Sequence, residues 1–469
     1  MRKEFFRKCL VRLSLLVIAK KILQSVKPDS NRFILCDPIF NPHKSFSFCC
    51  LFSSFSLAAK MNAKPLFLYE RKINKKELGM YRILNNQTIS VEEVISEVKG
   101  IPAFKKPGSL SKVYTYTIGG LPVGRCIWDE ALWNKKSTLL KVEDAIPSIK
   151  RATSYYYATK QILQSKNIVG GFFTHTTGVM SGISIRVLLA NKIPIFSAYG
   201  SISHFKKTDY FDSKTGYVKI PTAVSRDFLK KNEGSNQLKK ASLYLKRTFP
   251  IIGNNNGKQK WLVAMHAFSD TPNGSLQYIF KDYDEWFHFT LREIKKNQKV
   301  QWVIKPHPHR AKWPDDFRYG EIEKKLKPYS HISIWDENWD YNSKQVWYSK
   351  EFESFTGVVT CCGSLAIQFS AVGKQAICCG DNFFMDLKVM SRAKTRKDYA
   401  SKIQSAGYGP KKISKKKVKE AKLAYYLAYQ YLPSLLLPRN FTNWVNYNED
   451  QFLQNLRKEN NFSREPTFL

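Results

Sequence analysis

The stretch of sequence that decides the fold is Trp302-Val303-Ile304-Lys305-Pro306-His307-Pro308. Its apolar residues predict a buried strand, and the two prolines predict its end, because proline cannot donate a ladder hydrogen bond. Lys305 and His307 are therefore expected at the carboxyl end of the strand. In an open α/β sheet ligands bind at this edge, and a cation beside an imidazole suits a phosphate group.

Strands and helices alternate around this stretch through the second half of the chain. The predicted strands are 261–266, 300–305, 331–334, 357–361 and 375–379, and the predicted helices are 276–297, 343–354 and 364–372. Gly373 is expected to cap the last of these helices. Alternation of this kind predicts a parallel sheet with helices on its faces.

The first half carries a similar but less regular array. The predicted strands are 32–36, 65–69, 113–118, 171–175 and 193–197, with a turn at Gly119-Gly120, and the predicted helices are 44–60, 154–165 and 179–191. Segment 253–260, which holds three consecutive asparagines, is the best linker candidate. The fold class is therefore α/β, with two Rossmann-like domains at 30–252 and 261–410 that face a cleft. Residues 411–469 are expected to form helices that pack back on the domains.

The charge of the chain favours an anionic partner. Its 469 residues include 76 Lys and Arg against 38 Asp and Glu, a formal net charge of +38. Such a chain suits nucleic acid, anionic lipid headgroups, or phosphorylated glycolipids and nucleotides. Zinc-finger spacing and RNA-binding motifs are absent from the sequence, which makes specific nucleic-acid recognition the weaker interpretation. Because the basic residues are scattered, a generally lysine-rich composition is an alternative explanation.

The cysteines and the amino terminus bear on the cellular location. The nine cysteines include vicinal pairs inside apolar runs and no CxxC, which predicts buried thiols in a reducing compartment and no disulfide framework. Residues 1–29 form a basic, amphipathic segment whose apolar run, 13–19, is too short to span a bilayer. We interpret it as a membrane-surface helix; an ordinary first helix packed on the protein is the alternative.

Three polar clusters follow the predicted strands of the second domain. They are His266 with Ser269 and Asp270, Lys305 with His307, and Thr360 with Gly363 and Ser364. Each cluster alone is typical of a capped helix or a turn. Three of them at one sheet edge indicate a binding site for an anion, because a helix start also offers free N–H groups.

Stretches 302–308 and 360–373 resemble the bacterial capsule and surface polysaccharide biosynthesis proteins, which include 3-deoxy-manno-octulosonic acid (Kdo) transferases. More distantly, they resemble CDP-glycerol glycerophosphotransferases. Stretches 124–130 and 174–182 are similar to motifs of the same family. The sequence departs from the family pattern in two places: Gln368 or Ile367 stands near the usual place of a glutamate, and Arg125 stands where an acidic residue is usual.

The resemblance implies a GT-B architecture, with the acceptor in domain 30–252 and a nucleotide sugar in domain 261–410. The donor nucleotide and its phosphate would contact His266, Ser269, Lys305, His307, Thr360, Gly363 and Ser364. The catalytic candidates are Asp129, His175 and Asp270, since acceptor activation or covalent catalysis needs a base or a carboxylate. Such an enzyme needs no metal or resident cofactor, and the Asp282-Tyr283-Asp284 stretch is interpreted as the solvated face of a helix.

The leading hypothesis is a glycosyltransferase that extends a capsular or surface polysaccharide or a glycolipid from a nucleotide sugar, with CMP-linked donors among the candidates. The predicted location is the cytoplasm, with peripheral association with the inner face of the bacterial cell membrane. One alternative is transfer of a polyol phosphate from a CDP-linked donor. Another is a non-catalytic basic protein that binds membrane or nucleic acid. The sugar, the acceptor and the choice between retention and inversion stay open.

Overall fold

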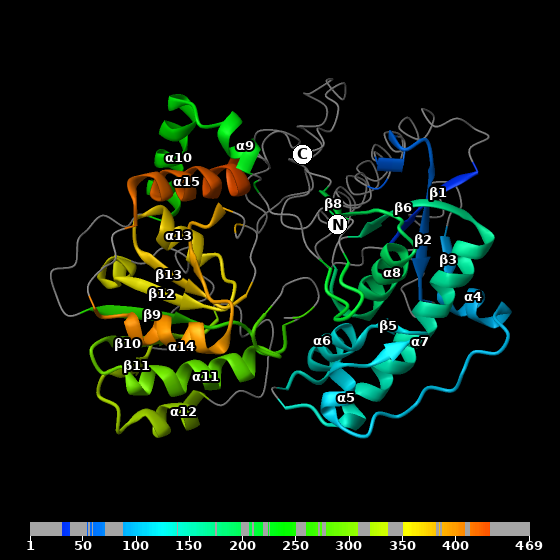
Figure 1. Cartoon of the computed structure of the whole chain (residues 1–469), viewed down its shortest axis with the longest axis horizontal. Coiled ribbons are helices and arrows are strands. Elements are labelled where there is room, and N and C mark those ends of the chain that lie inside the picture. Colours follow the sequence, from blue (N-terminus) through cyan, green and yellow to red (C-terminus); the bar gives the residue numbers. More distant parts are fainter. Residues whose placement is uncertain are drawn as a thin grey trace, which may run out of the picture. The chain divides into compact units, whose positions relative to one another are not determined.

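The structure is a computed structural model of the whole chain (Figure 1). It describes residues 31–37, 54, 57, 58, 60–70, 88–137, 139–173, 176–197, 206–208, 211–218, 224, 226–249, 259–270, 273, 278–307, 319–335, 350–380, 384, 387–408 and 413–431. The segment 1–29, most of the predicted helix 44–60, most of the linker 253–260 and the tail beyond 431 lie outside the described residues.

The chain divides into two compact units. The first comprises Met1–Trp128, Ala145–Pro221 and Gln430–Leu469, and the second comprises Asp129–Asp144 and Thr222–Tyr429. The second unit thus begins before the predicted linker, because α10 (Ser235–Thr248) packs on α15 (Lys415–Tyr426). The cleft expected between two domains stays a prediction.

The first unit holds a six-stranded sheet. Its order is β3 (Thr88–Ser90), β2 (Lys64–Tyr69), β1 (Arg32–Cys36), β6 (Asn167–Phe173), β7 (Ile195–Ser197) and β8 (Lys206–Thr208). All neighbours are parallel except β7 and β8. The packed helices include α4 (Val91–Glu97), α7 (Val142–Ser165) and α8 (Gly178–Ala190). This is the Rossmann-like arrangement that the alternating pattern predicted.

The stretch between β3 and α7 differs from the sequence prediction. The predicted strand 113–118 is wrong: its first residues belong to α5 (Leu110–Tyr114), which begins there because the Ser109 side chain accepts a hydrogen bond from the Lys112 N–H. A short hairpin of β4 (Thr117–Ile118) and β5 (Leu121–Pro122) follows. The predicted glycine turn joins its strands, with φ values of 55° and 79° at Gly119 and Gly120.

The second unit repeats the strand order of the first. Its sheet runs β11 (Ile332–Ile334), β10 (Gln301–Lys305), β9 (Lys260–Ala264), β12 (Gly357–Thr360), β13 (Gln375–Cys378) and β14 (Ser391–Arg392). Every pair in this sheet is parallel. The first five strands confirm the sequence prediction. The chain leaves β9 toward one side of the sheet and later returns to its other side as β12, which makes β9 and β12 the switch point.

Helices cover both faces of this second sheet (Figure 1). The helices of this unit include α9 (Arg226–Lys231), α10, α11 (Tyr283–Lys296), α12 (Tyr319–Leu326), α13 (Leu365–Ala371), α14 (Arg396–Ser405) and α15, and of these α9 and α10 pack on α15. On one face α13 packs on α15, and on the other α11 packs on α14. Where a helix was expected at 343–354, the described part is a 3-10 helix, Lys350–Ser354. Gly373 has a φ of 82° after α13, which confirms the predicted cap.

The core of the second unit is rich in tryptophan. Trp261, Trp286 and Trp302 are fully buried, and the rings of Trp261 and Trp302 lie 5.9 Å apart on neighbouring strands. The Trp286 indole donates a hydrogen bond of 2.9 Å to the hydroxyl of Tyr399 on α14. This bond ties α11 to α14 and satisfies a polar group inside the core.

The described cysteines have free thiols. Cys36, Cys126, Cys361, Cys378 and Cys379 are buried, as predicted, whereas Cys362 is partly exposed. Among the helices that the structure describes, none is both long enough and apolar enough to cross a bilayer.

Packing at the start of β12 gives a test of the fold. A Cβ atom added to Gly357 would lie 2.7 Å from the Trp261 ring. We expect Gly357→Ala to lower the free energy of unfolding by about 1–3 kcal/mol, because both residues are buried and overpacking strains the sheet. Gly320→Ala is the matched control, since an added Cβ there meets nothing within 4 Å. Urea denaturation followed by tryptophan fluorescence measures both, and equal midpoints would contradict the packing.

Candidate functional site

The strand register brings the three predicted clusters to one edge of the second sheet. Ala264, the last residue of β9, pairs with Lys305 at the end of β10 and with Thr360 at the end of β12. The residues that follow these strands therefore emerge side by side. Because β9 and β12 form the switch point, this edge is where an open α/β sheet binds its ligand.

His266 and Thr360 meet across the switch point. The Nε2 atom of His266 lies 3.2 Å from Thr360 Oγ1 and 3.4 Å from the backbone nitrogen of Cys362, which donates to it. Thr360 Oγ1 in turn accepts from the N–H of Gly363 at 3.2 Å. These bonds assign Nε2 as an acceptor, so the ring proton lies on Nδ1. Within the described part of the chain, no protein group accepts a hydrogen bond from Nδ1.

Aromatic packing holds the imidazole ring of His266 in place. The ring stacks on Tyr283 with centroids 4.4 Å apart and planes at 9°. Tyr283 and Tyr278 share a hydrogen bond of 3.1 Å, and the Tyr278 hydroxyl also lies 3.1 Å from Cys362 Sγ. Burial lowers the pKa of His266 to about 4, so the imidazole is neutral at physiological pH. Burial also raises the pKa of Cys362 to about 12, which keeps that thiol protonated.

Lys305 supplies the positive charge at this edge. Its side chain is 6% exposed, and burial lowers its pKa to about 8. Most of the amine is still protonated at neutral pH, but it gives up its proton far more easily than a surface lysine. His307, two residues farther on, is partly exposed. The strand end therefore offers a desolvated cation, which is worth more to a phosphate than a cation in bulk water.

The turn from β12 to α13 offers less to an anion than its sequence predicted. The N–H groups of Cys362 and Gly363 already donate within the protein, to His266 and Thr360. Ser364, the N-cap residue of α13, is exposed and its side chain makes no capping hydrogen bond. A Cβ atom at Gly363 would lie 2.9 Å from Thr360 Oγ1, so glycine lets the turn approach the strand closely.

Ser269 and Asp270 follow His266 in a tight turn. The Asp270 N–H donates to the carbonyl of Ala267 at 3.1 Å, and Ser269 is 3% exposed. Asp270 is partly exposed, and after burial its charge is a further cause of the raised pKa of Cys362. A carboxylate therefore lies near the His266 cluster.

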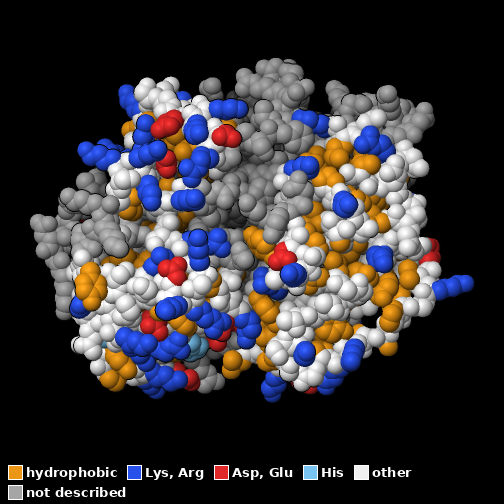
Figure 2. All heavy atoms as spheres, viewed as in Figure 1, with side chains coloured by type: hydrophobic (Ala, Val, Ile, Leu, Met, Phe, Trp, Pro, Cys, Tyr) orange, Lys and Arg blue, Asp and Glu red, His pale blue; other side chains and the backbone are white. Residues whose placement is uncertain are grey.

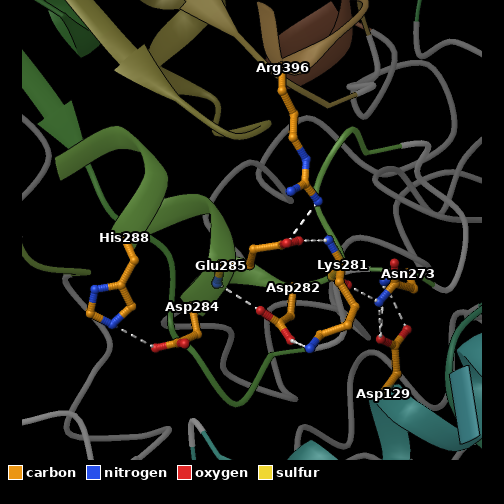
Figure 3. A network of polar contacts seen from close by, with 8 residues as sticks. All are labelled: Asp129, Asn273, Lys281, Asp282, Asp284, Glu285, His288 and Arg396. Atoms are coloured by element: carbon orange, nitrogen blue, oxygen red, sulfur yellow. Dashed lines mark hydrogen bonds and ion pairs between the residues drawn. The ribbon is translucent and has the colours of Figure 1, made fainter. Parts of the chain in front are cut away.

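Asp129 lies in a different setting from the one expected of an exposed catalytic base. It is fully buried in α6 (Gly124–Lys135), and its two carboxylate oxygens accept from the Asn273 N–H at 3.1 and 2.9 Å (Figure 3). The Asn273 side chain donates both to Asp129 and to the carbonyl of Lys281. The carboxylate thus anchors the segment that leads into α11, and a substrate would reach it only if this contact opened. Its catalytic role stays a prediction.

The start of α11 is held by a polar network, also drawn in Figure 3. Asp282, 7% exposed, caps the helix by accepting from the Glu285 N–H at 2.8 Å. Glu285 accepts from the Lys281 N–H and from Arg396 of α14, both at 2.7 Å. The expected helix 276–297 therefore begins only at Tyr283, and the expectation of a solvated face is wrong for Asp282 because it is the buried N-cap. The network positions Tyr283, the residue that stacks on His266.

The switch point of the first unit is built differently. Asp37, just after β1, is 3% exposed and accepts from Ser181 Oγ of α8 at 2.6 Å. Arg186 is fully buried and donates to the carbonyls of Gly182 and Gly216, both at 2.8 Å, so it serves packing. His175, the third catalytic candidate, lies outside the described residues.

Sequence reasoning missed the residues that surround His266. Tyr278, Tyr283 and Cys362 all contact one another near the imidazole. Nothing in the sequence sets these tyrosines apart from others, because their roles follow from where α11 packs. For Cys362 the sequence predicted a buried thiol, like that of its neighbour Cys361, whereas the structure shows it partly exposed beside the imidazole.

No protein-family model matches the chain, and no curated protein matches it. Similar solved structures include KpsC of Thermosulfurimonas dismutans, a beta Kdo 2,7 transferase, at 13% identity and a TM-score of 0.32, covering 57% of this chain and 79% of that one. The beta Kdo 2,4 transferase of the same KpsC aligns at 11% identity and a TM-score of 0.30, over 55% and 79% of the two chains.

A third similar structure is the spinosyn rhamnosyltransferase SpnG, at 10% identity and a TM-score of 0.27, covering 85% of this chain and 95% of that one. All three similarities are remote. The two Rossmann-like sheets are established by the strand order of this chain itself.

The contrast between two histidines of the second unit tests the site. Burial lowers the pKa of His266 to about 4, whereas the hydrogen bond that His288 donates to Asp284 raises the pKa of His288 above its usual value. We expect NMR titration to show His288 taking up its proton first as pH falls, and His266 staying neutral, with the proton on Nδ1, until near pH 4. His266→Gln assigns the signal. A His266 pKa near 6.5 would contradict the buried stack.

The same shift predicts a pH dependence of stability. Above about pH 6.5 the His266 side chain is neutral in both the folded and the unfolded chain, so it leaves the free energy of unfolding at its full value. As pH falls from about 6.5 toward 4, the unfolded chain binds a proton that the folded chain excludes, and the free energy of unfolding decreases.

Proposed function

We propose that this protein is a glycosyltransferase that moves a sugar from a nucleotide-sugar donor to a growing capsular or surface polysaccharide or a glycolipid. The observation that carries the proposal is the switch point of the second sheet, where His266 contacts Thr360 beside the strand that ends in the buried amine of Lys305. This combination suits the phosphate of a nucleotide. The family resemblance of the same stretches supports the donor class.

The two basic side chains would divide the work on the donor. The Lys305 ammonium would stabilise the negative charge that develops on the leaving phosphate as the bond between the anomeric carbon and the phosphate oxygen breaks. His266, being neutral, would donate one hydrogen bond from Nδ1 and so fix the orientation of the phosphate or ribose. With a pKa near 4 it would not act as a general acid at neutral pH.

The acceptor would act as the nucleophile that forms the new glycosidic bond. Its hydroxyl oxygen would attack the anomeric carbon while its proton passes to a base. Of the two carboxylates proposed for this step, Asp270 is the better supported, because it is partly exposed whereas Asp129 is fully buried. A metal ion has no role in this proposal, since Lys305 provides the charge that stabilises the leaving group.

A substitution at Lys305 tests the donor site. Lys305→Met keeps the length and apolar packing of the buried chain but removes its charge. We expect the affinity for a nucleotide to fall by roughly 10- to 100-fold, the usual worth of a hydrogen bond to a charged group. Isothermal titration with CMP, CDP, UDP and GDP measures this loss. Lys324→Met, on the exposed face of α12, is the control and should bind as the parent does.

Transfer assays with the corresponding donors then identify the reaction. Release of one nucleotide from a nucleotide sugar, with sugar found on the acceptor, supports the proposal; release of CMP from a CDP-polyol would identify the phosphotransferase alternative. If the Lys305→Met protein unfolds, His307→Ala replaces it, because His307 is partly exposed. Unchanged nucleotide affinity in both variants would overturn the site.

The pKa of Lys305 predicts how binding depends on pH. Since the Lys305 amine loses its proton near pH 8, nucleotide affinity should decline as pH rises through 8, whereas a surface lysine would keep its charge until above about pH 10. Titrations between pH 6.5 and 9.5 test this. The decline should vanish in Lys305→Met, and a flat profile in the parent protein would argue against a contact between the amine and the phosphate.

A further inference from the structure

One surface of the second unit is far more basic than the rest of the chain. Helices α9, α10 and α15 together carry twelve Lys and Arg but only two acidic residues. The chain as a whole has twice as many basic as acidic residues. A uniformly lysine-rich composition therefore does not account for this surface. In Figure 2 blue side chains clearly outnumber red ones over these helices, at the upper left.

The three helices form one face. Helix α15 packs on both α10 and α9. A groove of about 360 Å³ runs between α10 and α15, with Leu238 and Val418 among its apolar residues and Lys415, Lys419 and Lys422 at its side. Of these lysines, Lys419 forms an ion pair of 3.2 Å with Glu233. The groove is thus lined by both apolar side chains and lysines.

An exposed leucine stands at the centre of the cations of α10. Leu243 is 60% exposed, and Lys239, Lys240, Lys246 and Arg247, all exposed, lie three or four residues from it along the helix. Residues at these spacings share one side of a helix, so the leucine is ringed by positive charge. Lysine and arginine can reach anionic headgroups while an apolar side chain between them enters the interface below.

We propose that the face formed by α9, α10 and α15 docks the protein on an anionic phospholipid bilayer. The charge favours any polyanion, but the exposed leucine and the apolar groove favour lipid. A nucleic acid backbone gains nothing from Leu243, whereas a bilayer buries it. The lysines would lie at the headgroups, where each contributes to the attraction. This inference does not depend on the proposed reaction.

Vesicle binding by the full-length protein tests the proposal. We expect it to sediment with vesicles of 70% phosphatidylcholine and 30% phosphatidylglycerol, and not with pure phosphatidylcholine. Replacing Lys239, Lys240 and Lys246 by glutamine should weaken partitioning by about fivefold per lysine, on the order of 100-fold in all. Leu243→Ser, which keeps every charge, should also weaken it. Raising the salt should reduce binding of the parent.

The control removes the same charge elsewhere. Lys324, Lys325 and Lys327, exposed in α12 and the turn after it, are replaced by glutamine, and this variant should bind vesicles nearly as the parent does. Every variant keeps residues 1–29, so differences between variants report on the helices. Thermal melts confirm that each variant is folded, and single substitutions replace the triple one if it is not.

Two results would overturn the proposal. The first is an equal loss of vesicle binding in the α10 and α12 variants, which would mean that binding depends only on the net charge of the protein. The second is tight binding of a single-stranded RNA that the α10 substitutions abolish while vesicle binding persists, which would make the face a nucleic-acid surface.

Discussion

The contact between His266 and Thr360 is the interaction on which the rest of the site depends. It joins the ends of β9 and β12, the two strands between which the order of the sheet reverses. Because the strand order reverses between them, the chain leaves these two strands toward opposite sides of the sheet, and their ends meet at an open edge. The N–H of Cys362, in the turn after β12, donates to Nε2 and so assigns the imidazole proton to Nδ1. The meeting of these two strand ends therefore determines which atom of His266 is presented to a ligand.

Burial leaves the two basic groups of this edge in different charge states at neutral pH. His266 loses its charge because its ring is enclosed by Tyr283 and the turn after β12, whereas Lys305 keeps most of its charge although its pKa is lowered to about 8. His266 can therefore orient a ligand through one hydrogen bond, and Lys305 can neutralise its negative charge. The network of Asp282, Glu285 and Arg396 supports this division, since it holds the helix start that carries Tyr283.

The sequence predictions were right for most of the buried strands and less accurate where a capping side chain decides the start of a helix. Strands with long apolar runs were predicted well, because burial on both faces leaves a clear signal. The strand expected at 113–118 is instead partly helix, since one local cap at Ser109 outweighs the alternation of a short apolar stretch. Helix α11 begins at Tyr283 because Asp282 caps it. The same turn is also held from far along the chain, since Arg396 of α14 donates to Glu285.

The sequence by itself determined that this protein has two α/β arrays, and it identified Lys305, His266 and Thr360 as residues at strand ends. Periodicity, proline and glycine carry that information, because they act through the backbone within a few residues. Only the tertiary structure decided that His266 is neutral, that Asp129 is enclosed by Asn273, and that α10 and α15 form one cationic face. These properties depend on desolvation and on contacts between segments far apart in the chain, which no local pattern records.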